Sequence, residues 1–215
     1  MKFEKIKLDE WKRAKLFHTY MNDLKIVMSM TAEIDVAPLL SFIRENGLKF
    51  YPAMIWIVSK IVNSREEFRL GQQNGEGGRW DYVSPYYAHF HAEDEACAKL
   101  VTEYGDDLFD FHARFLADRK RFESLRAFDL TQIPPNTFDV SCLPWIKYKS
   151  FDMHVFDSGT YLAPVVTWGK WEQEGERAMM PLSMNIHHAA ADGFHLSRFF
   201  AEVQALIDHI SLQKF

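Results

Sequence analysis

Two adjacent histidines near the C-terminus are the residues whose types and spacing point most directly to chemistry. Residues 184–195 read MNIHHAAADGFH, so Asp192 follows His188 at four residues and a glycine comes next. Side chains on a strand alternate between its faces, and the even positions of the preceding run MMPLSMNI are apolar. This alternation predicts that His188 faces the core and His187 the more polar side. A partly dry imidazole is neutral near pH 7 and suits the role of general base.

Other interpretations of the same residues stay open. A metal site would use His187, His188 and His195, but adjacent strand residues point to opposite faces, and neither HExxH nor CxxC occurs. Asp192 could serve only as the N-cap of the helix that follows, and a histidine at a strand end is often a satisfied boundary residue. GxSxG, a Walker loop and GxGxxG after a strand are absent from the sequence, so a Ser-His-Asp hydrolase has no local support.

Four helices are predicted around these residues. One lies between Asp35 and Gly47, which have the order of an N-cap and a C-cap, and a mostly apolar one opens at Pro52 with AMIWIVSKIVN. A third spans residues 107–125. The last has apolar residues recurring at three and four: Leu196, Phe199, Phe200, Val203, Leu206, Ile207 and Ile210.

Strand signals lie mainly between residues 139 and 188. They are VSCLPWI (140–146), SFDMHVF (150–156), YLAPVVTW (161–168) and MMPLSMNIHH (179–188), with a hairpin predicted in KWEQEGERAM (170–179). The Gly-rich stretch 71–80 is typical of a hairpin or loop. Helices early and late, with strands between, predict one α/β domain over residues 1–215: a two-layer sandwich of one mixed sheet with helices on one face.

Composition narrows the class of protein. The 215 residues carry a net charge of −5 without a persistent Lys/Arg cluster, which disfavours nucleic acid as a partner. Apolar runs stay well below the ~18 residues of a membrane span, and the N-terminus has no apolar secretory core. The two cysteines, Cys97 and Cys142, are too few and too far apart for a disulfide framework. We expect a soluble cytoplasmic protein with no membrane partner.

The segment HHAAADGFH (187–195) resembles the HHxxxDGxH signature of the chloramphenicol acetyltransferase family. Further segments resemble that family in the right order: KFYPAMIW (49–56), SCLPW (141–145), YLAPVVTWGKW (161–171) and QEGERAMMPLS (173–183). The shorter HxxxDG core is shared with the acyltransferase cores of 2-oxo-acid dehydrogenase complexes and with condensation domains of peptide synthetases. The chain length matches the first family.

The resemblance implies direct acetyl transfer from acetyl-CoA, as co-substrate, to a hydroxyl of chloramphenicol or a related small molecule, the chemistry of an antibiotic-resistance enzyme. His188 would be the general base, Ser141 the oxyanion donor, and Thr167 the residue that holds a water near the intermediate. Asp192 would pair with Arg13 and order the loop that carries the base. No metal is implied.

The resemblance also implies substrate contacts and a homotrimer with active sites between subunits. Acceptor contacts would come from Tyr20, Thr19, Met28, Phe151 and Met153, and coenzyme contacts from Trp145, Lys170 and Trp171. Thr19 and Met28 stand where the family commonly has aromatics, so the sequence supports acetyl transfer more strongly than it supports chloramphenicol as the acceptor. An acyltransferase for another acceptor, a trimeric small-molecule binding protein without turnover, and a hydrolase that uses His188 to activate water are the alternatives.

Overall fold

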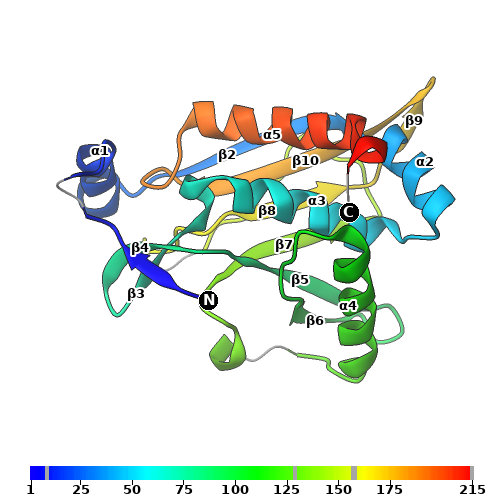
Figure 1. The fold of residues 1–215 in the computed structure, drawn as a ribbon, viewed down its shortest axis with the longest axis horizontal. Helices are drawn as coiled ribbons and strands as arrows, with labels where there is room; N and C mark the ends of the chain where they lie inside the picture. Colours follow the sequence, from blue (N-terminus) through cyan, green and yellow to red (C-terminus); the bar gives the residue numbers. More distant parts are fainter. Residues whose placement is uncertain (8–9, 128–129, 156–158, 214–215) are drawn as a thin grey trace.

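One mixed seven-stranded sheet forms the centre of the molecule (Figure 1). The computed structural model describes residues 1–7, 10–127, 130–155 and 159–213. Strand β7 runs parallel to both β5 and β8, and the other neighbours are antiparallel. The strand order is β2 (Val27–Asp35), β10 (Arg177–His187), β8 (Val165–Gly169), β7 (Thr137–Leu143), β5 (Ser84–His91) and β6 (Ala96–Val101), with β9 (Glu172–Glu174) paired to β10.

Helices cover one face of this sheet, as the sequence predicts for a two-layer sandwich (Figure 1). Helix α3 (Phe50–Ser64) is the most deeply buried, with every side chain from Pro52 to Ser59 inside the core. The remaining elements are α2 (Ala37–Asn46), α4 (Leu108–Arg121), α5 (Gly193–Asp208), the short α1 (Ala14–His18) with the π-helical turn η2 (Thr19–Asp23), the 3₁₀ turns η3 (Glu66–Arg69), η4 (Leu130–Gln132) and η5 (Ile210–Leu212), and a small sheet of β1 (Phe3–Lys5), β4 (Glu76–Trp80) and β3 (Leu70–Gln73).

The predicted helix ends are confirmed in part. Gly47 ends α2 with φ of 66°, in the left-handed region that favours glycine. Asp35 stands one residue too early to be the N-cap, and its Oδ1 instead accepts from the backbone N–H groups of Ala37 and Ala178, at 3.0 Å each. Asp35 therefore connects the start of α2 to β10. Helix α4 ends at Arg121 rather than at residue 125.

The strand predictions are partly wrong. Residues 150–155 of the predicted strand 150–156 have no regular structure, and residue 156 lies outside the described residues. This segment instead covers the sheet face away from the helices, where Tyr148 contacts Ser183 and Asp152 contacts Asn185. Both hairpins, over 71–80 and 170–179, are confirmed. Strands β2, β5 and β6 lie before residues 139–188, the region in which the sequence mainly predicts strands.

Candidate active site

His188 lies just beyond the end of β10, in the turn that leads to α5. The strand ends at His187, which is 3 % exposed, whereas His188 is only half-buried. The prediction that alternation carries His188 into the core is therefore wrong, because the strand ends one residue earlier than that pattern requires. The backbone N–H of His188 donates to the carbonyl of Ile26, 2.8 Å away, which fixes the turn to the segment before β2.

The His188 ring is oriented by a carbonyl and by an aromatic neighbour. Its Nδ1 lies 3.0 Å from the carbonyl oxygen of Ala191, and since a carbonyl only accepts, Nδ1 carries a proton and donates it. Nε2 makes no hydrogen bond within the described residues. The Tyr20 ring stacks on the imidazole with a centroid distance of 4.0 Å and an interplanar angle of 18°. A neutral imidazole in this tautomer presents a free lone pair on Nε2, as a general base requires.

His187 has the opposite tautomer. Its Nδ1 accepts from the backbone N–H of Ala189 at 3.1 Å, so that nitrogen is unprotonated and the ring is neutral. The carbonyl of His187 accepts from the N–H groups of Ala190 and Ala191. His187 thus organises the tight turn of three fully buried alanines, and His188 is the histidine left for chemistry.

Asp192 acts both as a helix cap and as an ion-pair partner. Its Oδ1 accepts from the backbone N–H of Phe194 and from His195 Nδ1, and its Oδ2 accepts from Arg13 Nη1 at 2.8 Å. Burial opposes ionisation of this carboxyl, but the hydrogen bonds from Arg13 and His195 outweigh it and lower the pKa of Asp192 to about 2. The pair expected from the sequence is present, and it joins the start of α1 to the loop after His188.

His195 is a residue whose role the sequence analysis missed. It was considered only as a possible metal ligand, but its Nδ1 lies 2.8 Å from Oδ1 of Asp192, the N-cap of α5, and donates to that carboxylate. The spacing of three residues between Asp192 and His195 was the signal. In the described part of the chain, no group of three His, Cys, Asp or Glu side chains converges as a metal site would require.

Ser141 and Thr167 are direct neighbours on the adjacent parallel strands β7 and β8. Ser141 is half-buried, and within the described residues its hydroxyl makes no hydrogen bond, so it is available as a donor. Thr167 is 2 % exposed, and it pairs across the sheet with Ser183 of β10. Thr31 of β2 extends this row, with its Oγ1 2.7 Å from Ser183 Oγ. A line of hydroxyl side chains therefore crosses the sheet face away from the helices.

One chain does not bring Ser141 and His188 together. Ser183 lies level with Thr167 and Ser141, and it precedes His187 by four residues of β10, which is roughly 13 Å at the usual strand rise. Strands β10 and β7 are separated by β8, which adds about 10 Å across the sheet. The base and the oxyanion donor therefore form two separate groups on the same subunit, with about 16 Å between the backbones of Ser141 and His187, the residue before the base.

The predicted acceptor residues divide between these groups. Tyr20 and the adjacent Thr19 lie in η2, and Met28 pairs with Ile186 at the His188 end of β2. Phe151 packs against Tyr148 with a centroid distance of 5.7 Å. Met153 lines a small cavity of about 40 Å³ beside Ile186 and His187.

The predicted coenzyme residues gather near Ser141. Trp145 is 63 % exposed and packs against Phe90, with ring centroids 5.0 Å apart. The backbone N–H of Lys170 donates to the carbonyl of Ile146 at 2.8 Å, which brings Lys170 and the neighbouring Trp171 to the segment that follows β7. Exposed rings beside a lysine form a surface that an adenine ring and phosphates can contact.

The described helices include none that is long and apolar enough to span a bilayer.

The fold is shared with solved acetyltransferases. A structure titled chloramphenicol acetyltransferase superposes with a TM-score of 0.82 at 19 % identity, over 96 % of this chain and 100 % of that one. A dihydrolipoamide acetyltransferase from Azotobacter vinelandii superposes with a TM-score of 0.69 at 16 % identity, over 99 % of this chain and 93 % of the other. These matches show that the chain has the α/β fold of those two structures.

Sequence relatives narrow the assignment. Residues 1–204 match the family model "CAT: Chloramphenicol acetyltransferase". A chloramphenicol acetyltransferase of Clostridium perfringens is 38 % identical over 208 residues, which are 96 % of this chain and 95 % of the relative. Chloramphenicol acetyltransferase 2 of Escherichia coli is 36 % identical over 98 % of this chain and 99 % of its own length. The chain belongs to the chloramphenicol acetyltransferase family. It is an acyltransferase, and the family implies acetyl-CoA as co-substrate and a small molecule as acceptor.

Proposed function

We propose that this chain transfers the acetyl group of acetyl-CoA to a hydroxyl of chloramphenicol or a related small molecule, directly and with His188 as general base. The observation that carries the proposal is the His188 ring: Nδ1 donates to the Ala191 carbonyl, and Nε2 has no hydrogen bond within the described residues. An imidazole fixed in this way can accept a proton only on Nε2. The family relatives support acetyl-CoA as the donor and chloramphenicol as the first acceptor to test.

His188 would remove the proton of the acceptor hydroxyl as its oxygen attacks the thioester carbonyl carbon. The Ser141 hydroxyl would donate a hydrogen bond to the carbonyl oxygen as it gains negative charge. Breaking of the carbon–sulfur bond then releases the coenzyme, and His188 returns its proton to the thiolate sulfur. Removal of one such oxyanion donor typically costs about 3 kcal/mol of barrier. Thr167, directly beside Ser141, would hold a water at the same intermediate.

We propose further that the enzyme is a homotrimer whose sites lie between subunits. The separation of about 16 Å between Ser141 and His187, the residue before the base, supports this arrangement. Both groups must reach one thioester, so the base of one subunit would work with the Ser141 of its neighbour. Trp145, Lys170 and Trp171 would then contact the coenzyme on the subunit that supplies Ser141, and Tyr20 would help shape the acceptor pocket beside His188.

Thiol release from acetyl-CoA in the presence of chloramphenicol and a panel of other alcohols and amines tests the activity. We expect release that requires an acceptor, and its loss in His188→Ala. The matched control is His209→Ala, because this exposed histidine lies at the opposite end of α5 and its Nδ1 also contacts a backbone carbonyl. Thioester cleavage without any acceptor would instead indicate a hydrolase. Tight acceptor binding without thiol release would indicate a binding protein.

A further inference from the structure

Three polar side chains from neighbouring strands form a largely buried cluster on the sheet face away from the helices. The polar cluster consists of Tyr86 of β5, Lys99 of β6 and Asp139 of β7. Lys99 Nζ forms an ion pair with Asp139 Oδ2, and each side chain is 17 % exposed. Lys99 Nζ also lies 4.5 Å from the centre of the Tyr86 ring. Tyr86 is 8 % exposed.

The polar cluster contains two buried atoms with unused hydrogen-bonding capacity. Within the described residues, neither Tyr86 Oη nor Asp139 Oδ1 has a hydrogen-bond partner. Burial, together with the charge of Asp139 and the nearby Cys97, raises the pKa of Tyr86 to about 12, so its hydroxyl keeps its proton and can donate. Asp139 Oδ1 can only accept. Because an unpaired buried polar atom is costly, this donor and acceptor require an explanation.

Strand register places the polar cluster close to Ser141. Asp139 precedes Ser141 by two residues on β7 and therefore faces the same side of the sheet, about 7 Å away. Tyr86 pairs with Asp139 on the adjacent strand, roughly 5 Å further across the sheet. A molecule whose reacting hydroxyl lies near Ser141 would reach the polar cluster with a body about 8–10 Å long, the size of a drug-like acceptor.

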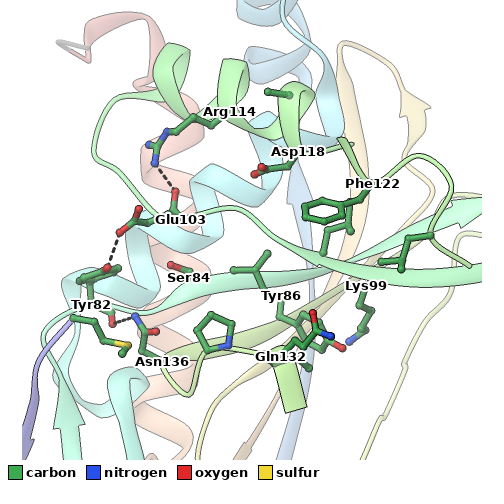
Figure 2. Close-up of a pocket in the computed structure, with 17 residues that line it drawn as sticks. Tyr82, Ser84, Tyr86, Lys99, Glu103, Arg114, Asp118, Phe122, Gln132 and Asn136 are labelled. Carbon is green, nitrogen blue, oxygen red and sulfur yellow. Dashed lines mark hydrogen bonds between the residues drawn. The ribbon is translucent and has the colours of Figure 1, made fainter. Parts of the chain in front are cut away.

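The polar cluster also borders an open groove. Tyr86 and Lys99 line a cavity of about 780 Å³ between α4, the edge strand β6 and the segment that precedes β7. Figure 2 shows these two side chains at one end of the cavity beside Gln132, with Tyr82 and Glu103 at the other end. The groove gives this part of the sheet the space that a substrate substituent needs.

We propose that Tyr86, Lys99 and Asp139 select the acceptor by binding an uncharged polar group, such as a hydroxyl or a primary amide, at its end remote from the acetylated hydroxyl. The proposal rests on the proposed acetyltransferase function and names the acceptor class. Lys99 and Asp139 neutralise each other. A charged substituent that paired with one of these two side chains would leave the charge of the other unpaired. A group that both accepts from Tyr86 Oη and donates to Asp139 Oδ1 pairs both atoms. An apolar ring substituent would leave both atoms unpaired.

Steady-state kinetics with a pair of acceptors tests the assignment. Two chloramphenicol analogues that differ only at the para position of the ring, hydrogen in one and a primary carboxamide in the other, are compared by thiol release from acetyl-CoA. We expect a KM for the carboxamide roughly 3–30-fold lower than for the unsubstituted analogue, with similar kcat, because one or two hydrogen bonds are gained. Tyr86→Phe and Asp139→Asn should each reduce this preference about 3–10-fold through KM, while the KM of the unsubstituted analogue changes little.

Tyr82→Phe is the matched control. Tyr82 lines the same groove at its far end, and its hydroxyl donates to Glu103 Oε1 at 2.7 Å. This variant should keep the wild-type preference. The assignment is overturned if the wild type prefers neither analogue, or if Tyr86→Phe and Asp139→Asn change both KM values equally, which is the mark of a structural role. If the wild type acetylates neither analogue nor any alcohol or amine of the panel, the proposed function itself fails and the polar cluster loses its assignment with it.

Discussion

Complementation between two inactive variants is the strongest test of the inferred assembly. His188→Ala removes the base, and Ser141→Ala removes the oxyanion donor. A base must lie about 3 Å from the attacking hydroxyl and a donor about 3 Å from the thioester oxygen, so the two groups must come within roughly 7 Å of each other. Within one subunit, His187, which precedes the base, is about 16 Å from Ser141 by strand register. The proposed mechanism therefore requires a site made by two subunits.

The expected yield of restored sites follows from the symmetry of a ring. The two variants are co-expressed equally and assemble at random. An interface is intact when a Ser141→Ala subunit supplies its unchanged His188 and the neighbouring His188→Ala subunit supplies its unchanged Ser141. This happens at about one quarter of interfaces in a cyclic oligomer. The mixture should thus show about 25 % of the wild-type rate of thiol release per subunit, while each variant alone is lower by about two orders of magnitude or more.

The control replaces Ser141→Ala with the double variant His188→Ala/Ser141→Ala. Co-expression of the double variant with His188→Ala supplies no intact base and should restore nothing. If the first mixture also shows no more than the summed activity of its parts, although the two subunits are shown to co-purify in one oligomer, base and donor act within one chain. The proposal of a shared site would then be refuted.

Three further outcomes follow from structural features of the chain. Asp192→Asn should lower the free energy of unfolding at pH 7 by about 1–2 kcal/mol, discounted for partial exposure, as measured by denaturant titration. Folding lowers the pKa of Asp192 from 3.8 to about 2, so the stabilisation by its carboxylate is present above the unfolded pKa and is lost as the pH falls toward 2. The free energies of unfolding of wild type and variant should therefore converge near pH 2. A difference that does not depend on pH would contradict this. Tyr20→Leu should reduce kcat/KM about 2–10-fold, because the His188 ring loses the aromatic ring stacked on it. Tyr20→Phe keeps an aromatic ring at residue 20 and should stay near wild type. Equal losses in both variants would assign the effect to the Tyr20 hydroxyl. Gly47→Ala should lower the melting temperature at a cost of about 1 kcal/mol, since alanine is strained at a φ of 66°, while an unchanged melting temperature would argue against that backbone conformation.

The sequence predicted those parts of the fold that depend on local signals. Gly47 and Asp192 mark helix ends through backbone geometry that neighbouring residues determine, so their positions were correct. The buried helix after Pro52 was recognisable because every turn is apolar. By contrast, the segment 150–155 has strand-like composition but covers the sheet instead of joining it, and composition alone does not distinguish these two uses of apolar residues.

The parts of the site that could not be predicted depend on contacts between distant residues. Alternation along β10 gave the wrong environment for His188 because a strand end is set by the turn that follows it, here by the contacts of His187 with the alanine turn. The adjacency of Ser141 and Thr167 follows from a parallel pairing that only the sheet order reveals. Lys99 and Asp139 are 40 residues apart in sequence, and the strand that carries Lys99 gave no clear signal.

The surroundings of His188 favour direct transfer over a covalent route. Within the described residues, the one hydrogen bond of its ring is to the Ala191 carbonyl, and no serine or cysteine is placed as a nucleophile for it to activate. Asp192 does not contact the ring either, because its oxygens are taken by Arg13, His195 and the helix N-terminus. In the proposed mechanism, a histidine without a carboxylate partner takes the proton of the acceptor hydroxyl and delivers the same proton to the departing thiolate within each turnover.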